Sequence, residues 1–304
     1  MCRLFGMSGG REPVQATFWL LEAPDSLSQQ SRREPDGTGL GSFTPDGWPV
    51  VSKQPLAAFE DQRFAREAKS VSSRTFVAHV RYASTGSLAP QNTHPFEQNG
   101  RLFAHNGVIG DLPRLERELA GAMALVGGET DSERFFALIS REIDRAGGGG
   151  EGSAGAVAEG IAGAARWVAA NLPVFALNLV LITASDLWAL RYPDVHDLYV
   201  LERAPGGPSG GRHLEHASAR GSIRVRSGDL AERPSVVVAT ERMDEDAGWR
   251  ALQSGELLHI DQDLHVTSTR VLDSPPAHQL SLSDLGARAA ASQRPAGGAG
   301  APHP

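Results

Sequence analysis

Apolar and β-branched residues occur in short runs along the chain, and such runs are typical of strands. Some alternate with polar residues, and others are continuous and bounded by turn-forming residues. The pattern predicts strands over Cys2–Met7, Thr75–Tyr82, Arg101–His105, Leu177–Thr183, Leu187–Arg191, Leu198–Glu202, Ile223–Ser227, Ser235–Thr240 and Leu257–Ile260. Residues Thr183–Asp186 have the composition of a tight turn, so we expect two of these strands to form a hairpin.

Apolar residues three and four positions apart predict helices elsewhere in the chain. The predicted helices are Val14–Glu22, Phe59–Lys69, Leu112–Leu125, Ser132–Arg145 and Ala154–Asn171. The start of the fourth helix carries a capping box, because Thr130 is followed three residues later by Glu133. In that motif the hydroxyl and the carboxylate each accept a hydrogen bond from a backbone N–H.

The predicted strands lie on both sides of a block of predicted helices, which indicates sheets and helices packed in layers. The glycine-rich segment Ala146–Gly155 is interpreted as a loop between two helices. The sequence from Ala287 to Pro304 is of low complexity and is expected to be disordered. We therefore predict a single domain over residues 2–286, followed by a tail.

Composition excludes several classes of protein. A net charge of -7 over 304 residues argues against general binding of nucleic acid, which requires a basic surface. The single cysteine excludes an intrachain disulfide, and the ten histidines show no spacing typical of metal ligands, so we predict neither a metal nor another cofactor. No signal peptide or membrane-length apolar run is evident, so we expect a cytoplasmic protein that does not contact membranes.

The only cysteine is Cys2, directly after the initiator methionine. Removal of Met1 would place a free α-amine on the same residue as the thiol. An α-amine has a pKa of about 7.7–8.0 and a free thiol one of about 8.5, so the amine is a suitable base for the thiol. A buried cysteine that acts only as a small apolar residue is the alternative.

An acyl-transfer nucleophile needs hydrogen-bond donors for the oxyanion. Asn106 and Gly107 follow a predicted strand, and a carboxamide and a backbone N–H there could converge on one oxygen. Asn-Gly is also the strongest short signal for a hairpin turn. The spacing alone favours the turn.

An amino-acid substrate needs a cation for its carboxylate and an anion for its ammonium group. Arg81 ends an apolar strand, where a guanidinium needs a partner and could bind a carboxylate through two hydrogen bonds. Asp131 lies at a helix start, where it could equally serve to complement the helix dipole. His79 and His105 lie within predicted strands and are interpreted as interior or half-exposed residues rather than catalytic ones.

Taken together, these motifs resemble the class II glutamine amidotransferases, which are N-terminal-nucleophile hydrolases. All of them lie within residues 2–133. In chain order they are Met1-Cys-Arg-Leu4, Asp36-Gly-Thr-Gly39, Ala78-His-Val-Arg-Tyr-Ala-Ser-Thr-Gly86, Asn92-Thr-His-Pro-Phe96, His105-Asn-Gly107 and Gly128-Glu-Thr-Asp-Ser-Glu133. The resemblance implies an α+β fold of the αββα type, a four-layer sandwich.

The resemblance also implies a role for each site residue. Cys2 would be the nucleophile and, through its amine, the base, while Asn106 and Gly107 would form the oxyanion hole. Arg81 would bind the α-carboxylate of glutamine and Asp131 its α-ammonium group. Two places depart from the family pattern, because Glu34 and Ser84-Thr85 stand where many members carry a histidine.

The resemblance is to the short, stand-alone members, because the chain leaves little room for a second synthase domain. The sequence therefore predicts an enzyme that cleaves the γ-amide of glutamine or of a γ-glutamyl compound through a thioester. One alternative is a γ-glutamyl amide or peptide hydrolase of ergothioneine or glutathione metabolism, with no ammonia transfer. In the amidotransferase case a separate synthase could accept the ammonia. A regulatory module that retains only the fold, and a redox protein with Cys2 as an exposed thiol, are further alternatives.

Overall fold

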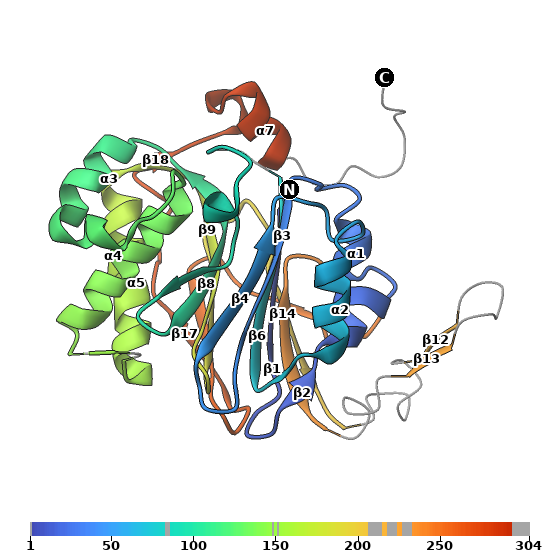
Figure 1. Cartoon of the computed structure of the whole chain (residues 1–304). Helices are drawn as coiled ribbons and strands as arrows, with labels where there is room; N and C mark the ends of the chain where they lie inside the picture. The colour runs from blue at the N-terminus through green and yellow to red at the C-terminus, as the bar shows by residue number, and fades with distance from the viewer. Residues whose placement is uncertain are drawn as a thin grey trace.

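Two sheets packed face to face form the centre of the molecule, and helices cover both outer faces (Figure 1). This arrangement is described by a computed structural model that covers residues 2–82, 86–147, 149–150, 152–205, 215–217, 224–226 and 233–293. It confirms the α+β class and the αββα sandwich. None of the described helices has the length and apolar character that crossing a membrane requires.

The first sheet places the start of β1 beside the end of β6. β1 lies between β14 and β6 and is antiparallel to both, with Arg3 opposite Val80. Cys2 is therefore at the sheet end where β6 finishes at Arg81. Across the sheet, the strands are β15 (Arg250–Ala251), β11 (Tyr199–Arg203), β14 (Ser235–Ala239), β1 (Arg3–Ser8), β6 (Thr75–Arg81), β3 (Gly37–Phe43) and β4 (Pro49–Gln54).

The second sheet is built around the long antiparallel pair β8 and β9, in which Asn106 is opposite Asn178. Its strands are, in order, β17 (Val266–Arg270), β16 (Glu256–Ile260), β10 (Leu187–Arg191), β9 (Pro173–Ile182), β8 (Arg101–Ile109) and β7 (Phe96–Gln98). A short strand, β18 (His278–Gln279), pairs in parallel with the start of β9. Apolar side chains from both sheets, among them Leu4 and Val180, fill the space between them.

Helices cover the outer face of each sheet with a separate apolar core. Those on the second sheet are α3 (Leu112–Leu119), η3 (Ala120–Leu125), α4 (Asp131–Arg145) and α5 (Ala154–Asn171), and those on the first are η1 (Phe18–Glu22), α1 (Leu27–Gln30) and α2 (Gln62–Ser70). The remaining elements are β2 (Val14–Gln15), β5 (Ser72–Ser73), β12 (Glu215–Ala217), β13 (Arg224–Arg226), η2 (Pro90–Asn92), η5 (Leu282–Asp284) and α7 (Ala287–Gln293).

Most predicted elements are present, but the predicted helix over Val14–Glu22 is wrong in its first part and confirmed only from Phe18 to Glu22. Its first two residues are β2, which pairs with β5, and only Phe18–Glu22 are helical. Phe18, Trp19 and Leu20 are consecutive and all fully buried. Three consecutive buried residues do not fit the single apolar face that the periodic pattern predicts.

The capping box at α4 is only half formed. The Thr130 hydroxyl accepts a hydrogen bond from the Glu133 N–H at 3.2 Å, as predicted. The Glu133 carboxylate instead accepts from the N–H groups of Gly127 (3.1 Å) and Gly128 (2.6 Å). Glu133 thus fixes the loop that leads into α4 rather than the N–H of the capping residue.

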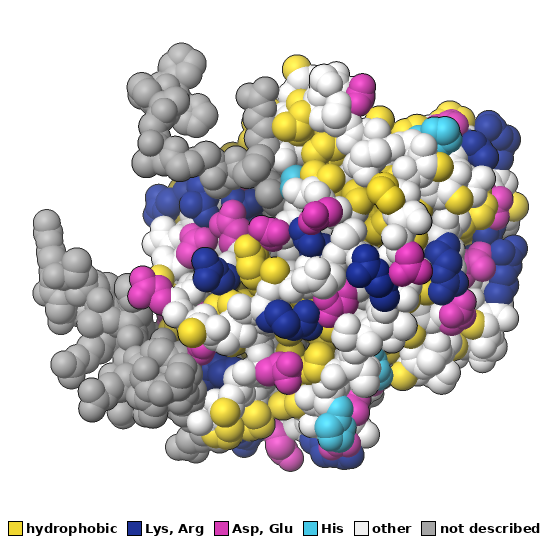
Figure 2. All heavy atoms as spheres, turned by 180° about the vertical axis from the view of Figure 1, so that it is seen from behind, with side chains coloured by type: hydrophobic (Ala, Val, Ile, Leu, Met, Phe, Trp, Pro, Cys, Tyr) yellow, Lys and Arg dark blue, Asp and Glu magenta, His cyan; other side chains and the backbone are white. Residues whose placement is uncertain are grey.

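The predicted tail is wrong for its first seven residues, which form α7. Ser292 and Gln293 are buried, because α7 packs on the loops at the end of the sheets where β1 begins (Figure 1). Residues 294–304 lie outside the described part of the chain, as do Ile223 and Ser227 at the ends of the strand predicted around β13. Basic and acidic side chains are interspersed over the face in Figure 2, and no wide basic patch is visible on it.

Candidate active site

Cys2 is held at the start of β1 by the backbone of Tyr82. Its Sγ accepts a hydrogen bond from the Tyr82 N–H at 3.2 Å and donates one to the Tyr82 carbonyl oxygen at 3.3 Å. The side chain is 8% exposed. The thiol is therefore fixed at one end of the sheet rather than free in solvent, which disfavours the redox alternative.

Burial makes Cys2 a weak acid. It raises the pKa of the thiol from 9.0 to about 11, and the negative charge of Glu34 acts in the same direction. Glu34, one of the two expected departures from the family pattern, has a buried side chain 3.9 Å from the Arg3 guanidinium. The other departure, Ser84-Thr85, lies outside the described residues. At neutral pH the thiol keeps its proton, so a reaction at Sγ requires a base close to it.

Asn106 and Gly107 lie inside a strand, so the prediction that they form a hairpin turn is wrong. β8 continues to Ile109 and pairs with β9 through both residues. The Asn106 Nδ2 donates a hydrogen bond of 2.8 Å to the carbonyl oxygen of Cys2. A Cβ atom on Gly107 would approach the Ala176 carbonyl oxygen to 1.8 Å, so only glycine allows β8 and β9 to approach this closely.

Arg81 and Asp131 reach the same region from opposite sides. Arg81 is 4% exposed, and one of its guanidinium nitrogens donates to the Ser87 carbonyl oxygen at 3.2 Å. Burial lowers the pKa of Arg81. Asp131 is 2% exposed, and its carboxylate accepts a hydrogen bond of 2.9 Å from the Ile109 N–H. The end of β8 therefore fixes the position of the carboxylate.

Four of the five predicted site residues line one small cavity, and the fifth, Asn106, bonds to the backbone of Cys2. The cavity volume is about 20 Å³, enough for about one water molecule, so a glutamine side chain would have to widen it. The lining residues are Cys2, His79, Arg81, Tyr82, Asn92, His94, His105, Gly107, Thr130, Asp131 and Ser132.

The cavity wall includes three buried histidines that the sequence analysis does not place in the site. The rings of His79 and His94 are 4.2 Å apart, and the His105 Nδ1 is 2.9 Å from the Ser132 hydroxyl. Burial lowers the pKa of all three, that of His79 to about 3. Strand alternation could have located two of them, because His79 and His105 lie two residues before Arg81 and Gly107.

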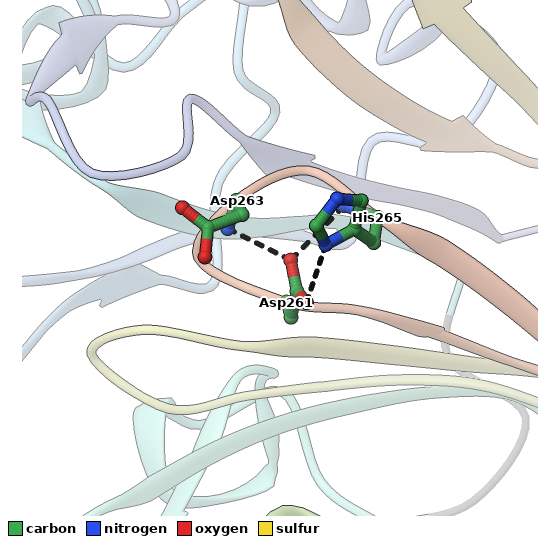
Figure 3. A group of neighbouring side chains, drawn as sticks. All are labelled: Asp261, Asp263 and His265. Atoms are coloured by element: carbon green, nitrogen blue, oxygen red, sulfur yellow. Dashed lines mark hydrogen bonds and ion pairs between the residues drawn. The ribbon is translucent and has the colours of Figure 1, made fainter.

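A cluster of possible metal ligands in the described part of the chain is remote from this cavity. Asp261, Asp263 and His265 lie in the turn between β16 and β17 (Figure 3). The turn packs against Gly10, beyond the end of β1 that is distant from Cys2. The Asp261 carboxylate accepts hydrogen bonds from the backbone of Asp263 and His265, and Asp263 pairs with Arg11 at 2.6 Å. These contacts explain the turn without a metal.

Comparison with known proteins identifies the family. The family model for class-II glutamine amidotransferases matches residues 1–282, and the chain belongs to this family. One relative is the gamma-glutamyl-hercynylcysteine sulfoxide hydrolase of Mycolicibacterium smegmatis, 28% identical over 88% of this chain and 99% of that protein.

Other relatives are longer. The glutamine–fructose-6-phosphate aminotransferase of Bradyrhizobium diazoefficiens is 24% identical over 87% of this chain. The chain spans 37% of the length of that enzyme, and 39% of the length of an uncharacterized protein of Methanocaldococcus jannaschii to which it is 35% identical over 151 residues. A predicted glutamine amidotransferase from Pseudomonas aeruginosa has the same fold, with a TM-score of 0.56 and 21% identity over 87% of this chain and 99% of that structure.

Proposed function

We propose that this protein hydrolyses the γ-amide of glutamine or of a γ-glutamyl compound through a thioester on Cys2. The observation that supports this best is the convergence of Cys2, Gly107, Arg81 and Asp131 on one buried cavity in a member of this family. A thiol, a backbone N–H, a guanidinium and a carboxylate are the groups that a γ-glutamyl substrate requires.

The proposed nucleophile needs a base, because burial keeps the thiol protonated. Removal of Met1 would create a free α-amine on Cys2 itself, and this amine accepts the thiol proton directly or through one water molecule. Sγ then attacks the carbonyl carbon of the γ-amide and a carbon–sulfur bond forms. In this proposal the Asn106 carboxamide and the Gly107 N–H donate to the oxygen on which negative charge develops.

The tetrahedral intermediate collapses with loss of the amide nitrogen. The carbon–nitrogen bond breaks, and the α-ammonium group returns its proton to the departing nitrogen, which leaves as ammonia or as a larger amine. Water then attacks the thioester with the amine again as base. Glutamate leaves and Cys2 is regenerated as a thiol.

In this proposal two buried charged residues, Arg81 and Asp131, bind the glutamyl end of the substrate, which carries its α-carboxylate and α-ammonium groups. Arg81 would bind the α-carboxylate with two parallel hydrogen bonds, and Asp131 would bind the α-ammonium group. The bond between the Asp131 carboxylate and the Ile109 N–H supports this role, because it fixes the carboxylate before the substrate arrives.

Hydrolysis without ammonia transfer is a second candidate, favoured by one observation. The sulfoxide hydrolase of M. smegmatis aligns over 99% of its own length, so a γ-glutamyl hydrolase of this size exists among the relatives. In the amidotransferase case, ammonia would pass to a separate synthase. The single, buried thiol suits a reducing compartment, and we include a cytoplasmic location in the proposal.

The test is to incubate the purified protein with L-glutamine and with γ-glutamyl amides and to measure glutamate. Release of glutamate that requires Cys2 supports the proposal. Absence of release from every γ-glutamyl compound, by a protein whose mature chain begins at Cys2, would favour the regulatory module instead.

A further inference from the structure

A second and much larger cavity lies at the same end of the sheets as Cys2. Its volume is about 680 Å³, within the range of small-molecule sites. Apolar and polar side chains both line it, and Phe175, Leu272, His196 and Gln293 are among the buried ones. Three charged residues also line it: Arg270 pairs with Asp273 at 3.2 Å, and Asp194 pairs with Arg191. Its residues come from the start of β9, the loop after β10, the segment after β17 and the end of α7.

Two hydrogen bonds and one strand pairing link a residue of this cavity to the backbone of Cys2. The Asn178 Nδ2 donates to the His196 carbonyl oxygen at 3.1 Å, and Asn178 is the strand partner of Asn106. Asn106 in turn donates to the Cys2 carbonyl oxygen. Opposite residues in an antiparallel pair are about 5 Å apart, so Asn178, which bonds to a residue of the large cavity, lies one strand spacing from Asn106.

Helix α7 contacts the large cavity at one end and Asp36, a neighbour of Arg81, at the other, although it lies beyond residue 282, where the family match ends. At one end, Arg288 is 3.5 Å from the Asp36 carboxylate, and the Asp36 N–H donates to the Arg81 carbonyl oxygen at 3.0 Å. At the other end, the Gln293 Oε1 is 2.8 Å from the His196 Nε2. The helix therefore extends from Asp36, which bonds to the backbone of Arg81, to the large cavity.

The two buried polar groups of the cavity are neutral, and its three charged residues are exposed. The Gln293 Nε2 donates to the Ser292 hydroxyl, which itself donates to the Ala289 carbonyl oxygen, so the Gln293 Oε1 faces His196. The His196 Nε2 then carries a proton, and burial lowers the pKa of this histidine to about 4. The buried part of the lining is apolar or neutral, and the charged residues are exposed and paired with other charged groups, so the cavity suits an uncharged, largely apolar ligand.

We propose that this cavity binds the leaving portion of a γ-glutamyl amide, and that this portion is an apolar or aromatic amine larger than ammonia. The proposal rests on the proposed function of Cys2 and names the class of its substrate. One relative is named as a hydrolase of a γ-glutamyl compound other than glutamine, gamma-glutamyl-hercynylcysteine sulfoxide. Free glutamine, whose leaving group is ammonia, would leave the cavity empty.

The first part of the test compares two substrates. L-glutamine and γ-L-glutamyl-1-naphthylamide share the glutamyl end, and the second releases 1-naphthylamine on hydrolysis. Val195→Trp and Ser254→Trp place indole rings at the cavity, because both residues line it and neither is buried. Val50→Trp on β4 is the matched control, since Val50 is comparably exposed and lines neither cavity.

We expect the two cavity variants to lose at least tenfold in kcat/KM for the naphthylamide and less than twofold for glutamine. The control should change neither value by more than twofold. Equal losses for both substrates, or no loss for the naphthylamide, would overturn the proposal. A change in oligomeric state on sedimentation of Val195→Trp would also overturn it, because the cavity would then be an interface between copies.

A binding measurement separates this proposal from the proposed function. The fluorescence of 1-naphthylamine, titrated with the Cys2→Ala protein, reports binding without turnover. Saturable binding that Val195→Trp abolishes and Val50→Trp retains supports the cavity even if no substrate is cleaved. No saturable binding overturns the cavity proposal, even if glutamine is hydrolysed.

Discussion

The Asn106 carboxamide donates a 2.8 Å hydrogen bond to the carbonyl oxygen of Cys2, a residue 104 positions earlier in the chain. The bond joins the start of β1 in one sheet to the middle of β8 in the other. Both residues are buried, so the contact is shielded from water. The hydrogen bond thus connects the two sheets at Cys2, the proposed nucleophile, and it places the Asn106 carboxamide beside the Cys2 backbone.

The first prediction is that the mature protein begins at Cys2. The proposed base is the α-amine of Cys2, which exists only after Met1 is removed. The thiol needs this base because burial raises its pKa to about 11, so it stays protonated at neutral pH. Intact mass spectrometry of an active preparation measures this directly. Full retention of Met1 in protein that releases glutamate would contradict the N-terminal mechanism.

The second prediction concerns the nucleophile. Cys2→Ala should abolish glutamate release, and Cys2→Ser should leave only a trace, because a hydroxyl is much harder for an amine to deprotonate than a thiol. Thermal melts should show that both variants remain folded. Comparable turnover by the alanine variant would end the covalent proposal.

The third prediction concerns binding of the glutamyl end. Arg81→Lys keeps the charge but loses the forked geometry, and Asp131→Asn removes the negative charge. Each should lower kcat/KM for glutamine by the equivalent of about 2–5 kcal/mol, because both groups are buried. Arg63→Lys, at an exposed position on α2, is the control for the first variant and should leave kcat/KM unchanged. Unchanged values for both site variants would place the glutamyl end elsewhere.

The sequence predicts best those elements whose burial follows a simple period. α5 begins and ends at the predicted residues, and β1 and β6 differ from the prediction by about one residue at their ends. β3 and β4 are missed. β3 contains Gly37, Gly39 and Gly41, and glycine is depleted in strands. A Cβ on Gly39 would approach the His94 carbonyl oxygen to 2.0 Å, a tertiary contact that no local pattern reveals.

In the candidate site, too, local sequence patterns do not reveal contacts between distant parts of the chain. The residue types at Cys2, Arg81 and Asp131 indicate the chemistry, and the motif order indicates the family. The local signal at Asn106-Gly107 predicts a turn, because Asn-Gly favours hairpins when nothing else acts on it. Pairing with β9 and the close approach of Ala176 determine the observed strand. The predicted turn rests on the Asn-Gly dipeptide alone, and contacts with a strand distant in the sequence override that local preference.

The fourth prediction is that stability falls as the pH drops below about 6.5. Burial lowers the pKa of His79 to about 3 and that of His94 well below 6.5, so both are neutral when folded. The unfolded chain takes up protons below pH 6.5 and the folded one does not. The free energy of unfolding should therefore fall by up to about 1.4 kcal/mol per pH unit for each histidine.

Urea denaturation at pH 7.5, 6.5 and 5.5 measures this slope. His79→Asn should reduce the pH dependence, because its replacement does not titrate in this range. His265→Asn alters an exposed histidine in the turn after β16 and serves as the control. An equal pH dependence in wild-type protein and His79→Asn would contradict the assignment of a neutral, buried His79.

The last prediction concerns Asn106 as an oxyanion donor. Asn106→Ala removes the carboxamide without adding charge, and loss of one such donor typically costs about a hundred- to a thousandfold in kcat. The lost bond to the Cys2 carbonyl oxygen should lower the free energy of unfolding by only about 1 kcal/mol. Asn178→Ala is the matched control, because Asn178 is the strand partner of Asn106 and bonds to His196 and Tyr192 instead of Cys2. The control should lose at least as much stability and far less kcat for glutamine. Equal losses of kcat in the two variants would show that Asn106 only supports the strand, and that the oxyanion is stabilised by other groups.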